Sequence, residues 1–336
     1  MKATDTETGV SGSQECRTEI NAMVCESPGN YVPGSASLSK PSFGEVTVRL
    51  EGCGVCASNL PVFEGRPWFS YPLQPGAPGH EGWGVVQTVG EGVKGLSSGD
   101  RVAFLSSNAF AEYETVGVHQ TVKLPSQLDG KPFPGEPLGC AVNVVQRCPV
   151  ASGERVAVVG TGFMGVLLVK LCTLAGARVI ALSRRSFSLD MAREFGAEHT
   201  VRIYDHQKAV EQVRGITGSE GCSKVFEASG YQKPLDLATD LTSTRATLVI
   251  AGYHQDNPRN VNMQQWNWKG LDVINAHERD EAVYMKGMRR AVDLVSTGQL
   301  NPSSLYTHTF PLSALNEAFS TLRERPEGFM KALVTV

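Results

Sequence analysis

The sequence predicts an α/β protein that combines a doubly wound parallel sheet with a second, β-rich domain. Three observations support this fold class. Strands and helices alternate after residue 153, a glycine-rich turn joins the first strand of that region to a helix, and short strands with glycine turns fill the region before residue 124. A chain of 336 residues is long enough for two domains with separate cores.

The β-rich domain is predicted from short apolar or alternating runs. These runs are residues 20–25, 44–50, 84–89, 102–105 and 111–116. Residues 51–65 are interrupted by glycine and are expected to form a loop. Residues 66–79 contain several prolines and aromatic side chains, which predicts an irregular segment that could wall a pocket.

The second region begins after an apolar segment, residues 135–147, which predicts a helix bridging the two domains. Six strands are then expected, at 155–159, 178–182, 200–203, 224–228, 247–251 and 271–276. Helices are expected after residue 163, around 208–215 and 234–241, and over 281–297. A last helix (312–322) and strand (331–336) are expected to return to the first domain.

We therefore predict a disordered lead-in at 1–18, a β-rich domain formed by 19–146 with 305–336, and a dinucleotide-binding domain at 147–304. The turn Gly160-Thr161-Gly162-Phe163-Met164-Gly165 carries the cofactor prediction. Gly160 permits the tight turn, Gly162 lets the backbone approach a pyrophosphate, and Gly165 allows helix and strand to pack closely. Amides at the start of the following helix would face the phosphates.

Composition excludes several classes of protein. The 31 basic and 34 acidic residues nearly balance, so neither nucleic acid nor a membrane surface is expected as a partner. The sequence has no apolar run of the roughly 18 residues needed to span a bilayer. Without a secretory signal, the eight scattered cysteines of this large α/β chain indicate reduced thiols and a cytoplasmic location.

The close pair Cys53 and Cys56 allows a zinc knuckle or a redox motif by spacing alone. A knuckle requires a second pair, and neither Cys16/Cys25 nor Cys140/Cys148 has the right spacing. A redox pair would be expected at the start of a helix, whereas this pair follows a strand. We expect Cys53 to be structural and chemistry to reside in Cys56 alone.

Five motifs in order resemble the medium-chain, zinc-dependent alcohol and polyol dehydrogenases. The motifs are EGCGVCASN, GHEGWG, GDRV, EPLGCAVN and VAVVGTGFMG, and the similarity covers the chain from residue 20 onward. The resemblance implies a Rossmann dinucleotide-binding sheet and a GroES-like catalytic domain. It also implies hydride transfer between an alcohol and a nicotinamide cofactor.

The resemblance further implies a zinc site. Cys56 and His80 match ligand positions, Glu136 of the EPL motif matches the third ligand of the polyol branch, and Glu81 matches a carboxylate beside the metal. Such a set leaves an open position for substrate oxygen. Cys140 competes with Glu136 for the third position, although we expect it beside the nicotinamide. The family's second, structural zinc needs four cysteines after the GHE strand. Residues 82–138 contain none, so we predict one zinc per chain.

Two residues depart from the family pattern. Asn59 stands where an aspartate usually accepts the second N–H of the ligand histidine, and Pro61 stands where some members have a relay histidine. We expect Asn59 to accept that hydrogen bond and Ser58 to take the substrate's proton.

The end of the strand 178–182 predicts which nicotinamide cofactor binds. Ser183, Arg184 and Arg185 replace the acidic residue that would bind a ribose hydroxyl, and two guanidiniums suit a 2′-phosphate. We therefore predict NADP, with NAD as the alternative. Gly252, after the strand 247–251, is also expected to contact the cofactor.

The substrate is predicted only as a class: a secondary alcohol, polyol or sugar, or the matching carbonyl compound. Trp68, Phe69 and Phe110 are candidate pocket residues. The alternatives are a zinc-free quinone or enone reductase of the same superfamily, or a catalytically silent binding relative. A homodimer or homotetramer is expected, with contact through the strand 271–276.

Overall fold

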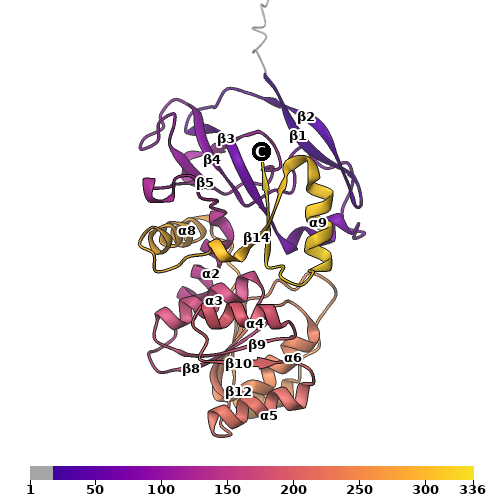
Figure 1. Cartoon of the computed structure of the whole chain (residues 1–336), viewed down its shortest axis with the longest axis vertical. Coiled ribbons are helices and arrows are strands. Elements are labelled where there is room, and N and C mark those ends of the chain that lie inside the picture. Colours follow the sequence, from indigo (N-terminus) through magenta and orange to yellow (C-terminus); the bar gives the residue numbers. More distant parts are fainter. Residues whose placement is uncertain (1–17) are drawn as a thin grey trace, which may run out of the picture.

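The computed structural model describes residues 18–336, which form two sheet-centred parts stacked along the long axis of the molecule (Figure 1). Apart from Thr18, the predicted lead-in lies outside the described residues. The predicted fold class is confirmed, because one part contains a six-stranded parallel sheet and the other a seven-stranded, mainly antiparallel sheet.

The six-stranded sheet has the strand order β10-β9-β8-β11-β12-β13 and is parallel throughout. Its strands are β8 (Arg155–Val159), β9 (Arg178–Ser183), β10 (His199–Arg202), β11 (Cys222–Glu227), β12 (Thr242–Ile250) and β13 (Asp272–Asn275). Val156–Val159 are fully buried, because β8 is central and covered on both faces. Strand order reverses between β8 and β11, which is where parallel sheets bind ligands.

The helices that follow these strands cover the sheet. They are α3 (Phe163–Leu174), α4 (Ser186–Glu194), α5 (His206–Thr217), α6 (Gln232–Leu241), α7 (Met263–Lys269) and α8 (Glu281–Ser296). Helix α4 was not predicted.

The seven-stranded sheet has the order β14-β15-β3-β4-β5-β7, with β6 also paired to β3. Its strands are β3 (Glu45–Val55), β4 (Gly82–Val89), β5 (Arg101–Phe104), β6 (Tyr113–Gly117), β7 (Thr121–Lys123), β14 (Tyr306–Pro311) and β15 (Lys331–Thr335). β15 lies between β14 and β3, so the C-terminal strand is built into the sheet of the N-terminal part. Helix α9 (Leu315–Glu324) connects β14 to β15.

Two predictions about the N-terminal part were incomplete. β1 (Thr18–Ser27) continues into a hairpin with β2 (Asn30–Leu38), which we did not predict because Pro33 and Gly34 interrupt its strand pattern. β3 continues to Val55, so Cys53 lies in a strand and not in the predicted loop. Cross-strand pairing on both sides of this segment, to β4 and β15, outweighs its two glycines.

Helix α2 (Gly135–Arg147) lies at the waist of the molecule together with α8, against which it packs (Figure 1). Its apolar side chains join the core of the six-stranded sheet, while its first turn approaches β4 and β5 of the other sheet. The bridging role predicted for this segment therefore describes its contacts well.

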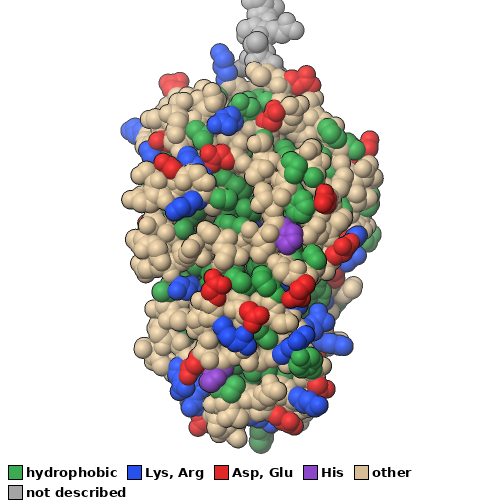
Figure 2. Space-filling model, viewed as in Figure 1, with side chains coloured by type: hydrophobic (Ala, Val, Ile, Leu, Met, Phe, Trp, Pro, Cys, Tyr) green, Lys and Arg blue, Asp and Glu red, His purple; other side chains and the backbone are tan. Residues whose placement is uncertain are grey.

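The visible face of the molecule carries interspersed acidic and basic side chains over both parts (Figure 2). Among residues 18–336, no helix combines the length and apolar character needed to cross a membrane.

Candidate active site and metal centre

Three strand ends bring the chemically important side chains of the catalytic part together. β3 and β4 are antiparallel, with Cys53 opposite Gly82, so Cys56 just beyond β3 meets His80 and Glu81 just before β4. β15 pairs with the other edge of β3, with Ala332 opposite Val55. Lys331 therefore starts β15 beside the same point.

Cys56, His80 and Glu81 form a group whose potential ligand atoms all lie within 4.8 Å of one another. The Nδ1 atom of His80 is 3.0 Å from the carbonyl oxygen of Pro78, to which it donates as the N–H tautomer. In the neutral imidazole, that bond leaves Nε2 with a lone pair for a metal. The hydroxyl of Ser58 lies 3.4 Å from the same Nε2 atom.

The predicted hydrogen bond between Asn59 and His80 was wrong. Asn59 instead donates from Nδ2 to the Pro78 carbonyl oxygen, at 3.0 Å, which is the same atom that His80 contacts. Asn59 thus supports His80 only through the backbone, because the Pro78 carbonyl oxygen accepts from both side chains. The spacing of the motif could not reveal this intermediary.

Glu81 is fully buried and forms an ion pair with Lys331, whose Nζ is 2.6 Å from Oε1. Gly54 makes room for this carboxylate, since a Cβ atom there would lie 1.7 Å from Glu81 Oε2. Lys331 also sits 5.1 Å from the ring centroid of Phe163 in the glycine-rich turn. Sequence reasoning missed Lys331, because only the pairing of β15 with β3 brings it to the site.

Glu136 stands in the first turn of α2 and is not part of the compact group of three. Its Oε1 atom accepts hydrogen bonds from the Tyr284 hydroxyl and, at 3.4 Å, from the Cys140 thiol. Cys140 therefore contacts Glu136, one helical turn away, and burial raises the pKa of its thiol well above the usual value. Tyr284, on α8, was not a predicted site residue.

The donor set fits a zinc ion. Thiolate, imidazole and carboxylate are the ligand types that Zn²⁺ accepts, and adjacent donors of a tetrahedral site lie about 3.6 Å apart. The local field also favours a cation. Burial lowers the pKa of His80, but its hydrogen bond to Cys56 and the negative charges of Cys56, Glu136 and Glu81 raise it more, to about 10.

Cys53 and Cys56 are both free thiols. Cys53 is fully buried inside β3, and burial raises its pKa well above the usual value. A buried neutral thiol is the structural role predicted for Cys53.

The glycine-rich turn has the geometry of a phosphate-binding loop. Gly160 has a φ of +95°, which disfavours any residue with a side chain. A Cβ atom on Gly162 would meet nothing within 4 Å, whereas one on Gly165 would lie 2.0 Å from the Gly160 carbonyl oxygen. Gly162 therefore leaves open space before α3, and Gly165 lets the helix close onto the turn.

The end of β9 differs from expectation at Arg185. Its guanidinium is directed to the C-terminal segment, where it donates to the carbonyls of Pro326 and Phe329. Another arginine, Arg202, which was not predicted, lies beside the end of β9. Arg202 pairs with Ser183 in the β9–β10 register, donates to the Arg184 carbonyl at 3.2 Å, and covers the Tyr204 ring at 4.7 Å.

Gly252 follows β12, and its amide donates to the Glu227 carbonyl at 2.7 Å. A Cβ atom there would lie 2.3 Å from the amide nitrogen of Gly230, so the chain passes close to the ends of both strands at the site edge of the sheet.

The candidate pocket residues differ in their burial. Phe110 as a pocket residue was wrong: it is fully buried and packs edge-on against Tyr31 and Phe319, at 6.3 and 5.9 Å between ring centroids. Its backbone is tied down by a hydrogen bond to the Gly76 carbonyl, which turns the ring into the core. Trp68 is 57 % exposed and lies 6.1 Å from Phe69.

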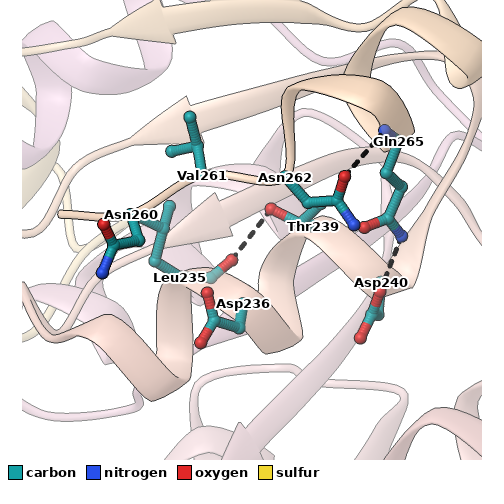
Figure 3. A pocket seen from close by; sticks show the side chains of 8 residues that line it. All are labelled: Leu235, Asp236, Thr239, Asp240, Asn260, Val261, Asn262 and Gln265. Atoms are coloured by element: carbon teal, nitrogen blue, oxygen red, sulfur yellow. Dashed lines mark hydrogen bonds between the residues drawn. The ribbon is translucent and has the colours of Figure 1, made fainter.

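A crevice of about 240 Å³ lies between α6 and the segment leading into α7 (Figure 3). Its lining, which includes Asp236, Asp240 and Asn262, contains none of the predicted site residues. Thr239 and Asp240 belong to the C-terminal end of α6, away from the strand ends that face the glycine-rich turn. We assign it no part in the reaction.

Comparison with known proteins agrees with this geometry. The alcohol dehydrogenase GroES-like domain matches residues 42–126, and the zinc-binding dehydrogenase family matches residues 164–295. The 2-dehydro-3-deoxy-L-galactonate 5-dehydrogenase of Pseudoalteromonas atlantica is 27 % identical, with 91 % of this chain and 95 % of that protein covered. Sorbitol dehydrogenase of Gallus gallus is also 27 % identical, covering 91 % and 94 %.

A zinc-binding dehydrogenase from Sinorhizobium meliloti, solved bound to NADP, superimposes with a TM-score of 0.80 at 25 % identity, covering 95 % of this chain and all of that one. Both family matches lie in the expected order, each over the sheet that it describes. The predicted resemblance is thereby confirmed: this chain is an oxidoreductase of the zinc-dependent alcohol and polyol dehydrogenase type, within the medium-chain dehydrogenase/reductase superfamily.

Proposed function

We propose that this protein oxidises a secondary alcohol of a polyol or sugar derivative, or reduces the matching carbonyl compound, using one zinc ion held by Cys56, His80 and Glu136. The convergence of Cys56, His80 and Glu81 within 4.8 Å carries the proposal. A zinc-free reductase would have no use for a thiol, an imidazole and a carboxylate around one point.

The chain's own residues define the remaining roles. Zinc, when bound, supplies Lewis-acid polarisation of the substrate oxygen. Ser58, beside His80 Nε2, is suited to accept the hydroxyl proton of the substrate, and its hydroxyl is 3.5 Å from Asn59 Oδ1. The ion pair with Lys331 places a cation against the Glu81 carboxylate, next to the donor group.

The substrate class rests on similarity. Two relatives of nearly full-length coverage are named for a sugar acid and for sorbitol, which supports a hydroxylated substrate. Trp68 and Phe69 remain candidates for one wall of its pocket.

Preference for NADP is a further part of the proposal. Arg184 and Arg202 flank Ser183 at the ends of neighbouring strands, and arginine holds phosphate bidentately. We expect R184A and R202A each to lower kcat/KM with NADP about tenfold or more, the scale of a lost charged hydrogen bond, while leaving the NAD value unchanged. A several-fold preference of the unmodified enzyme for NAD would refute this assignment.

Assembly and location are also proposed. β13 is an edge strand beside the exposed side chains of Trp268 and Val273, which supports a homodimer formed by pairing of these edges. The free thiols of the described residues support a reducing compartment such as the cytoplasm.

The central test measures metal and turnover together. Purified protein is expected to contain about one zinc per chain, and C56S is expected to lose both zinc and activity on a panel of secondary alcohols and polyols. C53A is the matched control, because Cys53 lies three residues away but points into the core, and it should keep its zinc. Full activity in metal-free protein would end the proposal.

A further inference from the structure

Tyr284 and Cys140 form a three-sided cluster with Glu136. The Tyr284 hydroxyl donates to Glu136 Oε1, the Cys140 sulfur lies 2.7 Å from that hydroxyl, and the same sulfur lies 3.4 Å from Glu136 Oε1. Tyr284 is 148 residues from Glu136 in sequence, so only the fold brings the two together.

Close packing of α2 against α8 fixes this cluster. A Cβ atom on Gly139 would lie 2.6 Å from Met288 Cγ, and one on Gly287 would lie 2.3 Å from Asn143 Oδ1. The two glycines therefore let the helices approach closely. Glu136 and Cys140 are four residues apart on α2 and share the face that meets Tyr284.

The hydrogen bonds are distributed unevenly over the carboxylate. Both bonds that the described residues make to it fall on Oε1, and both donors are neutral groups, a phenol and a thiol. Oε2 accepts no hydrogen bond from the described residues, so it is the oxygen that could bind a metal. Partners of this kind orient a ligating carboxylate.

We propose that Tyr284 is a positioning residue that holds Glu136 in place by its hydrogen bond and packs against the Cys140 thiol, whose proton goes to Glu136, so that a carboxylate and not a second thiolate completes the zinc site. The inference rests on the proposed function, because it assumes zinc at Cys56 and His80. It resolves the competition between Glu136 and Cys140 that the sequence left open.

Two readouts other than activity test this role. In Y284F, competition with a chromophoric chelator should show zinc binding about 10- to 100-fold weaker than in the unmodified protein. Cobalt-substituted protein should show thiolate-to-cobalt charge transfer of one sulfur ligand. In Y284F that intensity should rise towards two sulfurs, and in Y284F/C140S it should return to one.

Y31F is the matched control. Tyr31 is also a buried tyrosine, but it packs between Phe63 and Phe319 and belongs to neither α2 nor α8. Y31F should change neither zinc affinity nor the cobalt spectrum. Two-sulfur intensity in the unmodified protein would overturn the inference even if Y284F did not fold, and so would zinc affinity and spectrum unchanged in folded Y284F. Failure of the unmodified protein to bind zinc would instead overturn the proposed function.

Discussion

Glu114 is a carboxylate whose ionisation opposes folding. It borders an open hollow of about 300 Å³ that residues 105–108 also line, and its Oε2 atom is buried without a hydrogen-bond partner. Burial raises the pKa of Glu114 from 4.5 to about 7, although contacts with Ser106 and the amides of Ser107 and Asn108 oppose the shift. The group therefore holds its proton more tightly in the folded chain than in the unfolded one.

A pH-dependent loss of stability follows from this pKa. The pKa of Glu114 is higher in the folded state than in the unfolded one, so binding of its proton stabilises the folded state. This stabilisation is fully present below pH 4.5 and is lost as the pH rises through about 7. E114Q removes this titration. The difference in unfolding free energy between E114Q and the unmodified protein should therefore shift by about 2 kcal/mol in favour of E114Q from pH 5 to pH 8. Urea unfolding at the two pH values measures this difference.

E91Q serves as the comparison, since Glu91 is exposed. Its unfolding free energy relative to the unmodified protein should be independent of pH. A relative stability of E114Q that is the same at pH 5 and pH 8 would show that Glu114 titrates normally.

At the scale of elements, the sequence predicted best where one strong pattern acts locally. The bounds of α2 and β8 agree with the predicted 135–147 and 155–159, because continuous apolar runs between glycine or proline signals define them. Elements defined by their neighbours were missed or shortened. β3 extends to Val55 only because β4 and β15 pair with it.

The same distinction applies to the candidate site. Cys56, His80 and Glu136 were predicted from motifs, whereas Lys331, Tyr284 and Arg202 have no local signature. Each is brought to the site by a contact between distant elements: β15 with β3, α8 with α2, and β10 with β9. Phe110 shows the opposite error, since its aromatic character suggested a pocket before the aromatic core around Tyr31 was visible.

At the scale of the whole molecule, one loop of the dinucleotide-binding part reaches across to the catalytic part. Asp256 accepts hydrogen bonds from Arg66 at 2.9 and 3.3 Å, and Gln255 donates to the carbonyl of Ala57 at 3.3 Å. Ala57 stands between Cys56 and Ser58, so this contact falls on the segment that carries the proposed zinc ligand and proton acceptor.

The loop is firmly anchored on its own side. His254 lies 2.9 Å from the fully buried carboxylate of Glu227, and Arg259 donates to His254 and to the Gly230 carbonyl, each at 3.0 Å. The buried carboxylate of Glu227 also accepts a hydrogen bond from the Gly230 amide. A loop that is held on its own side and hydrogen-bonded to Arg66 and Ala57 of the other part should resist separation of the two parts around the cofactor.

Loosening this contact should therefore speed release of the cofactor. D256N removes the charge that pairs with Arg66, and a partly exposed ion pair is worth at most about 1 kcal/mol, so we expect NADPH dissociation to become about two- to fivefold faster, with little change in melting temperature. Stopped-flow displacement of NADPH fluorescence measures the rate. E64Q removes the other partner of Arg66, at 3.0 Å, within the catalytic part, and should leave the rate unchanged. Equal rates for D256N and E64Q would show that the contact between the parts does not control cofactor release.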